Sequence, residues 1–392
     1  MIKTINMKKN NALCAIVSIM MIISCDNTKQ IPCDADYSEV DTIYYNYKEG
    51  KDISRDSVFS KITFLPLETR EDNLIGMTDK VIIGDSTIII VDKYIAKSVF
   101  MFDYCGDYIG RISNNGNGRN EYLEISDVCQ RPDKSIAIFD ELRGNILVYD
   151  ERGNYIETIK SELFANAMEF IDEELMAFDI YNRYSAKMAP YGGASFVIRD
   201  KEMNNKYFFG TNNKLDNCNY SRYYNLYSFG GNVYCNVNFE DYIFQLSSDS
   251  VKAKYRIEYG PENVNRYPYQ TKEELYSLQK QYPFFEGEFV ELKDYTYLMF
   301  RGEDGNELIY NHSTKETIAL SSGFNNPMIV FFRRPMARYK DNTLVCALTA
   351  SELLVHRSML SEASIQKETV DRLFSAIDID SNPVLFFFEV VL

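Results

Sequence analysis

Short apolar runs, each broken by glycine, aspartate or asparagine, recur along most of the chain. The runs at 88–91 and 136–139 are almost wholly aliphatic or aromatic, which is typical of strands buried on both faces. Residues 81–91 have the punctuation of a hairpin, with Gly84-Asp85-Ser86 as its turn. The pattern predicts an all-β protein.

Two stretches of the chain repeat each other. Residues 102–109 (FDYCGDYI) match residues 149–156 (YDERGNYI) at an offset of 47, and the strands at 88–92 and 135–140 match upstream of them. Repetition at this period, with several short strands per unit, indicates a radial β array such as a propeller rather than a helical solenoid.

Further blade-like segments and two helical interruptions follow. Thr271-Lys272-Glu273-Glu274 is a capping box that predicts an inserted helix on a loop between blades. Residues 351–377 are predicted to be helical in two pieces. The blade-like segments are expected near 127–160, 168–210, 226–258, 289–320 and 328–349.

The chain ends in an apolar segment, 384–392, which follows Asn382-Pro383 and must pair internally. In propellers the closing blade is commonly built from both chain ends, which hides the sheet edges. The 47-residue repeat suits seven blades, whereas the insertions at 262–283 and 351–380 favour six. We predict an all-β, six-bladed propeller, with seven blades as the less favoured count. Short helical insertions and a C-terminal helical segment before the closing strand complete it.

The N-terminus has the form of an export signal. Lysines precede an apolar stretch at 12–23 that is too short to span a bilayer comfortably. Ile22-Ile23-Ser24-Cys25 looks like a bacterial lipobox, which implies diacylglycerol on the Cys25 sulfur and cleavage before Cys25. The alternative is an ordinary signal peptide with a coincidental cysteine.

This reading divides the chain into a lipoprotein signal peptide (1–24), a polar tether (25–39) and a propeller domain (40–392). The acylated Cys25 makes the lipid bilayer a partner. We expect a monomer in the cell envelope, anchored at the outer membrane, with the periplasmic or surface face left open.

Composition and charge make some kinds of binding partner and some kinds of chemical site unexpected. The net charge is −15, and no basic run exceeds Arg333-Arg334, so nucleic-acid binding is not expected. There are 30 Tyr and 25 Phe but no Trp, which supports β structure. No Cys-x-x-Cys pair is present. Mostly buried free thiols are favoured over disulfides for Cys33, Cys105, Cys129, Cys218, Cys235 and Cys346.

The segment Gly116-x-Gly118-x-x-Glu121-Tyr122 invites comparison with a phosphate-binding loop. It lacks the Gly-Lys-Ser/Thr ending, and no helix follows it. We therefore expect Gly116, Gly118, Glu121 and Tyr122 to form a tight connection between blades in which the glycines need positive φ.

This link, the strands after it and the aromatic-Asp-x-x-Gly turn at 149–153 resemble an NHL-type repeat. Together with Phe64-Leu65-Pro66-Leu67-Glu68-Thr69 and Asn382-Pro383, they make the chain similar to six-bladed β-propeller lipoproteins of diderm bacteria. The resemblance covers about residues 40–392. It implies a fold and does not imply an established activity.

Evidence for catalysis is weak. The chain has only two histidines, His312 and His356, and no Gly-x-Ser-x-Gly elbow. We expect both to be surface or packing residues. No cofactor is predicted, although a calcium site is left open. Four aspartates are expected to cap turns, and some of them could supply such a site: Asp92, Asp103, Asp140 and Asp150.

Two sets of residues are candidates for ligand contact. Arg333 and Arg334 could grip an anionic group at the channel mouth, or could be solvated charges at a strand end. Arg222 and Tyr223 could belong to a sugar-contacting loop or to an outer strand.

The sequence assigns no catalytic residue and favours a binding or interaction module for glycans, peptides or an envelope protein. The alternative is a propeller-type hydrolase, lyase or lactonase with a carboxylate or calcium site in the axial channel. A structural subunit of a larger envelope complex is a third hypothesis. Fold alone does not decide among them.

Overall fold

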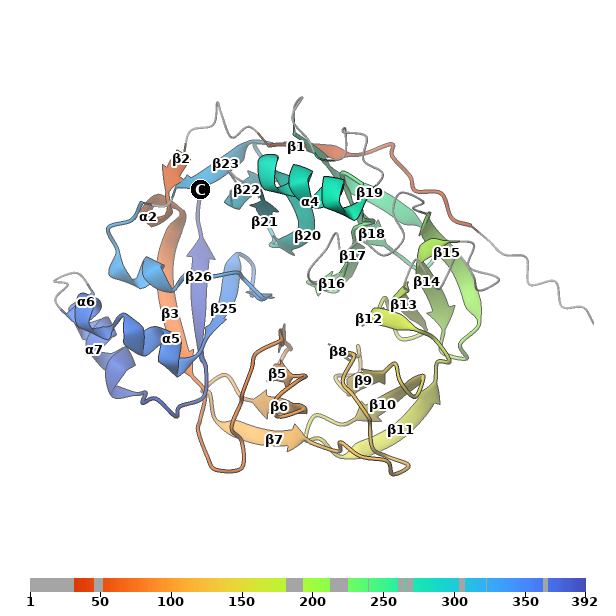
Figure 1. The fold of residues 1–392 in the computed structure, drawn as a ribbon, viewed down its shortest axis with the longest axis horizontal. Helices are drawn as coiled ribbons and strands as arrows, with labels where there is room; N and C mark the ends of the chain where they lie inside the picture. Colours follow the sequence, from red (N-terminus) through yellow and green to blue (C-terminus); the bar gives the residue numbers. More distant parts are fainter. Residues whose placement is uncertain are drawn as a thin grey trace, which may run out of the picture. The chain divides into compact units, whose positions relative to one another are not determined.

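Six β-sheets stand around a common axis in the computed structural model of the protein (Figure 1). They confirm the all-β, six-bladed propeller. They belong to one unit that begins at Pro32, upstream of the boundary expected at residue 40. The structure describes residues 32–45, 52–180, 193–211, 225–238, 240–259, 264, 271–302, 307–321, 323–361 and 366–392.

Blades 1 to 3 each have four strands that follow one another from the axis outward. The second strands are buried along their whole length, because a neighbouring blade covers each face. In chain order the strands are β4 (Lys80–Ile83), β5 (Ile88–Asp92), β6 (Ser98–Phe102) and β7 (Tyr108–Ile112) in blade 1, β8 (Asp127–Gln130), β9 (Ile136–Asp140), β10 (Asn145–Tyr149) and β11 (Tyr155–Lys160) in blade 2, and β12 (Ala165–Phe170), β13 (Leu175–Ile180), β14 (Ala194–Asp200) and β15 (Asn205–Thr211) in blade 3.

Blades 4 and 5 each gain a fifth, parallel strand from the N-terminal segment. These added strands cover the outer edges of the two sheets, which would otherwise expose unpaired backbone groups. Their strands are β16 (Leu226–Phe229), β17 (Asn232–Cys235), β18 (Tyr242–Leu246), β19 (Val251–Glu258) and β1 (Asp41–Tyr44) in blade 4, and β20 (Phe284–Glu291), β21 (Tyr295–Arg301), β22 (Glu307–Asn311), β23 (Thr317–Ser321) and β2 (Asp52–Ser54) in blade 5.

Blade 6 joins the two ends of the chain, as predicted. Strand β26 lies between β25 and the N-terminal strand β3, and it pairs antiparallel with β3 from Val384↔Pro66 to Val390↔Phe59. The internal pairing of this apolar terminal strand is thereby confirmed. The strands of blade 6 are β24 (Ala337–Tyr339), β25 (Thr343–Leu348), β26 (Val384–Val390) and β3 (Phe59–Pro66).

The two sequence signatures at the chain ends meet beside this pairing. The side-chain amide of Asn382 donates to the Glu68 carbonyl at 2.8 Å and its oxygen accepts from the Ile75 N–H at 2.9 Å. The Asn382 N–H donates to the Thr69 hydroxyl at 2.9 Å. Asn382 therefore ties the start of β26 to the segment that follows β3.

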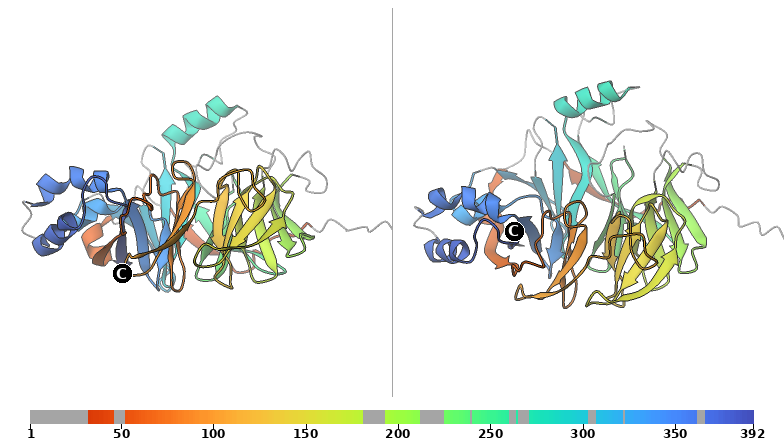
Figure 2. Two further views of the ribbon diagram at one scale, coloured as in Figure 1. Left: turned by 90° about the horizontal axis from the view of Figure 1, so that it is seen from below. Right: turned by 60° about the horizontal axis from the view of Figure 1, so that its bottom comes forward.

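Helix α4 (Lys272–Gln281) is the predicted insertion between blades 4 and 5 and stands clear of the ring on one face (Figure 2). The capping box predicted at Thr271 is present, because its hydroxyl accepts from the Glu274 N–H and the Glu274 carboxylate accepts from the Thr271 N–H. The remaining helical elements are α2 (Arg55–Val58), the 3-10 helix η2 (Pro327–Phe331), α5 (Ala350–Val355), α6 (Arg357–Ser361) and α7 (Lys367–Ser375).

The C-terminal helical segment forms three short helices beside blade 6 (Figure 1), where two pieces were expected. Helix α5 ends at His356, whose N–H bonds back to Leu353, and α6 starts at the next residue. Helix α7 follows Gln366, whose φ of 60° lies in the left-handed region. This backbone conformation separates α7 from the helical residues before it.

The expected turn caps are present in blades 1 and 2. Asp103 Oδ1 accepts from the N–H groups of Cys105 and Asp107 at 2.7 and 2.9 Å. Asp150 makes the equivalent pair of bonds at 2.8 Å each. Gly153 in the second turn has a φ of 84°, which glycine adopts without strain. The repeat therefore encodes an identical turn between third and fourth strands.

Blade 3 keeps this turn although its sequence lacks the Asp-x-x-Gly motif. Asp200 Oδ1 accepts from the Asn204 N–H at 2.8 Å, and Met203 takes the left-handed position with a φ of 66°. The turn is thus preserved by the aspartate cap, while the glycine is replaced by a residue that pays a conformational cost there.

Two further aspartates confirm the capping expectation at the ends of second strands. Asp92 is fully buried, and its carboxylate accepts from the N–H groups of Gly76, Met77 and Ile95 at 2.8 to 2.9 Å. Asp140 is its equivalent in blade 2. Each carboxylate accepts from backbone N–H groups of the link that leads into its blade, and so holds that link against the second strand. These carboxylates are therefore structural.

The link at Gly116 connects blades 1 and 2 as predicted, but the reason given for its glycines is wrong. Neither Gly116 nor Gly118 has positive φ. A Cβ on Gly116 would lie 2.2 Å from Glu121 Oε2, which accepts from the Gly118 N–H at 2.6 Å. The glycines make room for this carboxylate. Tyr122, the last residue of the link motif, is fully buried, and its hydroxyl donates to the Lys97 carbonyl.

The described cysteines are all free thiols. Cys129, Cys235 and Cys346 are buried, whereas Cys105 is exposed and Cys33 is partly exposed; Cys218 lies outside the described residues. A search of the described residues for a helix long and apolar enough to cross a membrane found none.

Candidate ligand-binding channel

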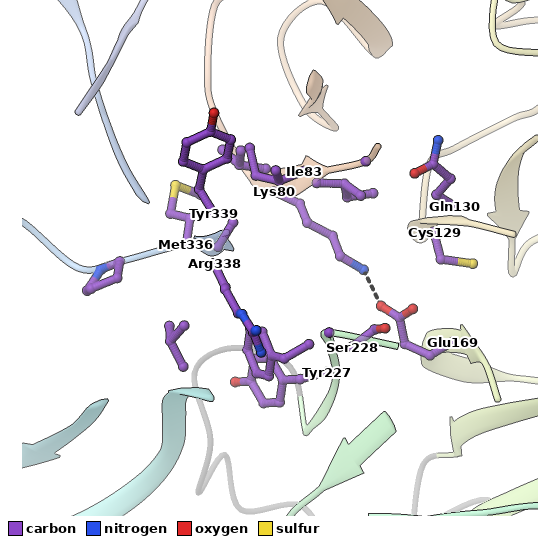
Figure 3. A pocket seen from close by; sticks show the side chains of 18 of the residues that line it. Lys80, Ile83, Cys129, Gln130, Glu169, Tyr227, Ser228, Met336, Arg338 and Tyr339 are labelled. Carbon is purple, nitrogen blue, oxygen red and sulfur yellow. Dashed lines mark hydrogen bonds and ion pairs between the residues drawn. The ribbon is translucent and has the colours of Figure 1, made fainter. Parts of the chain in front are cut away.

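A pocket of about 870 Å³ lies on the axis of the propeller, where the first strands of the blades converge (Figure 3). All six blades contribute to its lining, so the pocket is a product of the closed ring. The residues that line it are Asp79–Asp85 and Tyr104 from blade 1, Cys129 and Gln130 from blade 2, Glu169 from blade 3, Leu226–Gly231 from blade 4, Glu288–Val290 from blade 5 and Arg334–Asp341 from blade 6.

The pocket reaches one face of the ring. The turns that join the first and second strands of blades 1, 4 and 6 belong to its lining, at Gly84, Gly230 and Lys340. We call this side the hairpin face. Because first strands run toward it in every blade, their later residues lie nearer the mouth, and their earlier residues lie deeper.

An ion-pair cluster joins blades 1, 2 and 3 beside the pocket. Lys80 Nζ lies 3.1 Å from Asp127 Oδ1 and 3.1 Å from Glu169 Oε1. Asp127 is fully buried and also accepts from the Met168 N–H at 3.0 Å. Lys80 and Asp127 are 47 residues apart and begin equivalent first strands. The repeat therefore places opposite charges at matching positions of adjacent blades.

Glu169 has the protonation behaviour of an acid–base group. Burial raises its pKa to about 7, with the Asp127 charge adding to the rise and Lys80 opposing it. Burial likewise lowers the pKa of the neighbouring Lys93. A carboxyl group that titrates near neutrality inside a pocket is a common feature of functional sites and also occurs in structural ion-pair networks.

A second buried carboxyl group lies near this cluster. Burial raises the pKa of Asp179 to about 7, and hydrogen bonds from the side-chain amides of Asn166 and Asn225 partly offset that rise. Their distances to Asp179 Oδ2 are long, at 3.5 and 3.4 Å. Asp179 belongs to β13, where it pairs with Phe196 of β14, and it does not line the pocket.

The opposite side of the channel carries its own charge pairs. Glu288, a buried residue of β20, forms an ion pair with Arg334, which precedes β24. Arg301 contacts Glu286 Oε2 at 3.0 Å and lies 3.8 Å from Glu288. Burial raises the pKa of Glu288, while the two arginines lower it. The Glu288–Arg334 pair links the inner strand of blade 5 to blade 6, whereas Arg301 braces the same strand from within blade 5.

Aromatic side chains form the apolar part of the lining. Tyr227 stacks on Phe229, with ring centroids 5.8 Å apart, and meets Phe289 edge-on at 5.1 Å. The Tyr227 hydroxyl is buried and has no hydrogen-bond partner among the described residues. Buried hydroxyls are usually paired, so this group is an exception in the wall of the pocket.

The structure separates the two arginines singled out in the sequence. Arg334 lines the pocket, as the channel-mouth hypothesis requires, although its partner there is Glu288. Arg333 is exposed, does not line the pocket, and donates to the carbonyls of Val330 and Phe332. Arg333 is therefore an exposed charge in the segment between η2 and β24.

The other predicted residues lie away from the pocket or outside the described chain. Gly116, Gly118, Glu121 and Tyr122 belong to the link between blades 1 and 2 and do not line the pocket. The structure does not describe Cys25, Arg222 or Tyr223.

His312 is a packing residue between blades 4 and 5. Its Nε2 lies 2.8 Å from Thr296 Oγ1 and 3.2 Å from the Tyr255 hydroxyl. Both hydroxyls donate to the buried Glu291 carboxylate, at 2.6 and 2.7 Å. This network joins the two blades away from the pocket lining.

Lys80, Asp127 and Glu169 were not identified from the sequence. Aligning the first strands at the 47-residue offset would have paired Lys80 with Asp127 and suggested an ion pair. Glu169 carries no such signal, since blade 3 does not follow this period. Within the described ranges, no group of three or more His, Cys, Asp and Glu side chains is placed to hold a metal ion.

The comparisons with known proteins assign a family. Residues 38–389 match the model described as "Domain of unknown function (DUF4934)". The chain belongs to the DUF4934 family. No curated protein matches it.

Among solved structures, this DUF4934 chain is similar to a "putative exported protein" from Bacteroides fragilis NCTC 9343, with a TM-score of 0.73 and 15% identity over 90% of this chain and 100% of that one. That likeness shows the fold. A DUF4221 member from Bacteroides vulgatus gives a TM-score of 0.45 at 12% identity over 85% and 97% of the two chains, which is too low to support an argument.

Glu169→Gln should change how stability depends on pH. The folded-state pKa of about 7 lies above the ordinary value of 4.5, so folded Glu169 holds a proton that unfolding releases. The free energy of unfolding should therefore fall as pH rises from about 4.5 to about 7. Glu169→Gln should remove this contribution, on the order of 1 kcal/mol or more, as measured by urea unfolding across that range.

Glu174→Gln is the matched control, because the Glu174 side chain is 60% exposed, and it should keep the wild-type profile. Parallel stability profiles for wild type and Glu169→Gln would show that Glu169 does not titrate in this range.

Proposed function

We propose that this protein is a ligand-binding module of the bacterial cell envelope, which takes a small polar ligand, such as a glycan or peptide segment, into its axial channel. The observation that carries the proposal is the pocket of about 870 Å³ built by all six blades. Ligand sites in proteins commonly have volumes of roughly 300–1,000 Å³.

The chemistry of the lining supports a ligand with both polar and apolar parts. Stacked aromatic rings at Tyr227 and Phe229 offer an apolar surface to such a ligand. Charged pairs on both sides of the channel fix the positions of Lys80 and Arg334. A rigid lining of this kind limits the entropy lost on binding.

The proposed location rests on the N-terminal sequence and on a relative. The lipobox-like Ile22-Ile23-Ser24-Cys25 supports acylation of Cys25 and anchoring at the outer membrane. The similar structure from Bacteroides fragilis is described as an exported protein. An envelope location places the channel where glycans, peptides and other envelope proteins are available as partners.

A hydrolase, lyase or lactonase is the second candidate, favoured by the pKa of about 7 of Glu169 in the pocket. The two functions are separated by following a bound compound over time. A binding module returns it unchanged, whereas an enzyme converts it. A calcium-dependent lactonase would also retain stoichiometric calcium through purification without chelator.

Filling the channel should abolish binding. Ser228 is exposed and lines the pocket (Figure 3), so Ser228→Trp places a large ring in the ligand's volume. Compounds captured by the wild-type protein on glycan and peptide arrays should be lost, with affinity lowered at least about tenfold.

Ser375→Trp, at an exposed position at the end of α7, provides the same chemical change away from the channel and should keep wild-type binding. If Ser228→Trp retains the same compounds with unchanged affinity, the axial channel is not the binding site.

Cys25→Ser should release the protein from the membrane, because the serine hydroxyl does not receive the diacylglycerol that the thiol would carry. We expect the variant to move from the membrane fraction to the soluble fraction and to lose acyl label in intact-mass analysis. Cys14→Ser changes a cysteine within the apolar stretch and should remain membrane-bound. A Cys25→Ser protein that stays acylated and membrane-bound would refute the lipid anchor.

A further inference from the structure

Arg338 crosses part of the channel mouth. It belongs to β24 of blade 6, and its side chain extends toward Tyr227 of blade 4 (Figure 3). A Cβ on Gly230, in the turn after β16, would lie only 2.7 Å from Arg338 Nη1. Because Gly230 has no side chain, the guanidinium of Arg338 can occupy this position at the mouth.

The described residues use only a small part of the hydrogen-bonding capacity of Arg338. Its Nε donates to the Lys340 carbonyl at 2.8 Å, which fixes the orientation of the group. A guanidinium has five N–H donors. Among the described residues, no Asp or Glu forms an ion pair with Arg338. The two terminal nitrogens thus remain for another partner.

The described acidic residues at the mouth form no ion pair with Arg338, because each is paired with another cation; Lys293 lowers the pKa of Asp341 most, and Arg338 adds a smaller effect. Asp341 lies 2.9 Å from Lys293, and Asp85 lies 3.5 Å from Lys134. Deeper in the pocket, Glu169 is paired with Lys80 and Glu288 with Arg334.

A second cation lies beside Arg338 at the mouth. The Lys340 ammonium is 4.9 Å from the centroid of the Tyr339 ring and forms no ion pair with an acidic side chain of the described chain. The mouth therefore carries two positive charges without acidic partners in a protein whose net charge is −15. Local positive charge of this kind attracts anions.

We propose that Arg338 binds a carboxylate group of the ligand at the hairpin-face mouth of the channel. This inference rests on the proposed function and adds the class of ligand to it. The planar guanidinium matches a carboxylate in a two-bond arrangement, and Lys340 adds charge at the rim. A uronic-acid sugar and the C-terminus of a peptide both present this chemistry.

The experiment compares charged and neutral forms of otherwise identical probes on the full-length protein in detergent. The probes are trigalacturonate with its methyl ester, and an N-acetylated tripeptide acid with its amide. In one of the two pairs we expect calorimetry to show that the acid binds at least about tenfold more tightly than the neutral form. The pair that shows this difference identifies the source of the carboxylate.

Arg338→Gln should weaken the acid form about 10- to 100-fold and leave the neutral form unchanged, since one charge-assisted pair is lost. Arg338→Lys should keep part of the difference. Arg152→Gln, in an exposed turn of blade 2, makes the same charge change outside the channel and should bind as wild type. Among the described residues the Arg338 side chain makes one hydrogen bond, to the Lys340 carbonyl, so its replacement should leave the fold in place.

Two results would overturn the inference, and they are distinguishable. Equal affinity for acid and neutral forms, or an acid preference that survives Arg338→Gln, removes the role of Arg338 while channel binding stands. Failure of all four probes to bind counts against channel binding by this class of ligand, and the role of Arg338 falls with it.

Discussion

The antiparallel pairing of β26 with β3 is the contact on which the rest of the molecule depends. It joins the C-terminal strand to a strand that begins at Phe59, and it closes the ring of six sheets. Phe386 lies at its centre, fully buried, with its ring 4.9 Å from that of Phe331. Asn382 locks the adjoining segments by bonding to Glu68 and Thr69. The sequence signatures at the two chain ends therefore act together to hold the segments beside the β26–β3 pairing.

Closure of the ring also determines the chemistry at the axis. Residues of all six blades line the pocket. Its ion pairs join one blade to another: Lys80 pairs with Asp127 and Glu169, and Arg334 pairs with Glu288. These groups are buried by neighbouring blades, which is why the pKa of Glu169 rises to about 7. In the part of the chain that the structure describes, no acidic side chain forms an ion pair with Arg338 or Lys340 at the mouth.

Much of the architecture was predictable because its signals are local. Strand runs, hairpin turns, the Thr271 capping box and the closing strand were readable from residue order alone, and the structure confirms them. The role of Gly116 was misjudged, because the cause is a carboxylate folded back from Glu121 rather than backbone φ. In blade 3 the turn survives with Met203 in place of glycine, so the motif disappears while the geometry remains.

The candidate site was harder to predict, since it consists of single residues brought together from six blades. Arg334 was identified from its neighbours in the sequence, but its partner Glu288 is 46 residues away by number and is positioned only by the ring. Lys80 and Arg338 belong to short strands whose sequence gives no functional signal. Such contacts depend on how the blades are ordered and tilted around the axis, and local sequence patterns carry no information about that arrangement.

The most direct test of this account is unfolding of Phe386→Ala, followed by circular dichroism and by thiol labelling of the buried Cys129 in blade 2. If the closing pair holds the whole ring together, both transitions should coincide and shift together by about 3–5 kcal/mol. Phe324→Ala, at a 38% exposed position, should shift neither. An early loss of part of the dichroism, with Cys129 protected to the wild-type denaturant concentration, would show that blade 6 unfolds alone and would contradict the account.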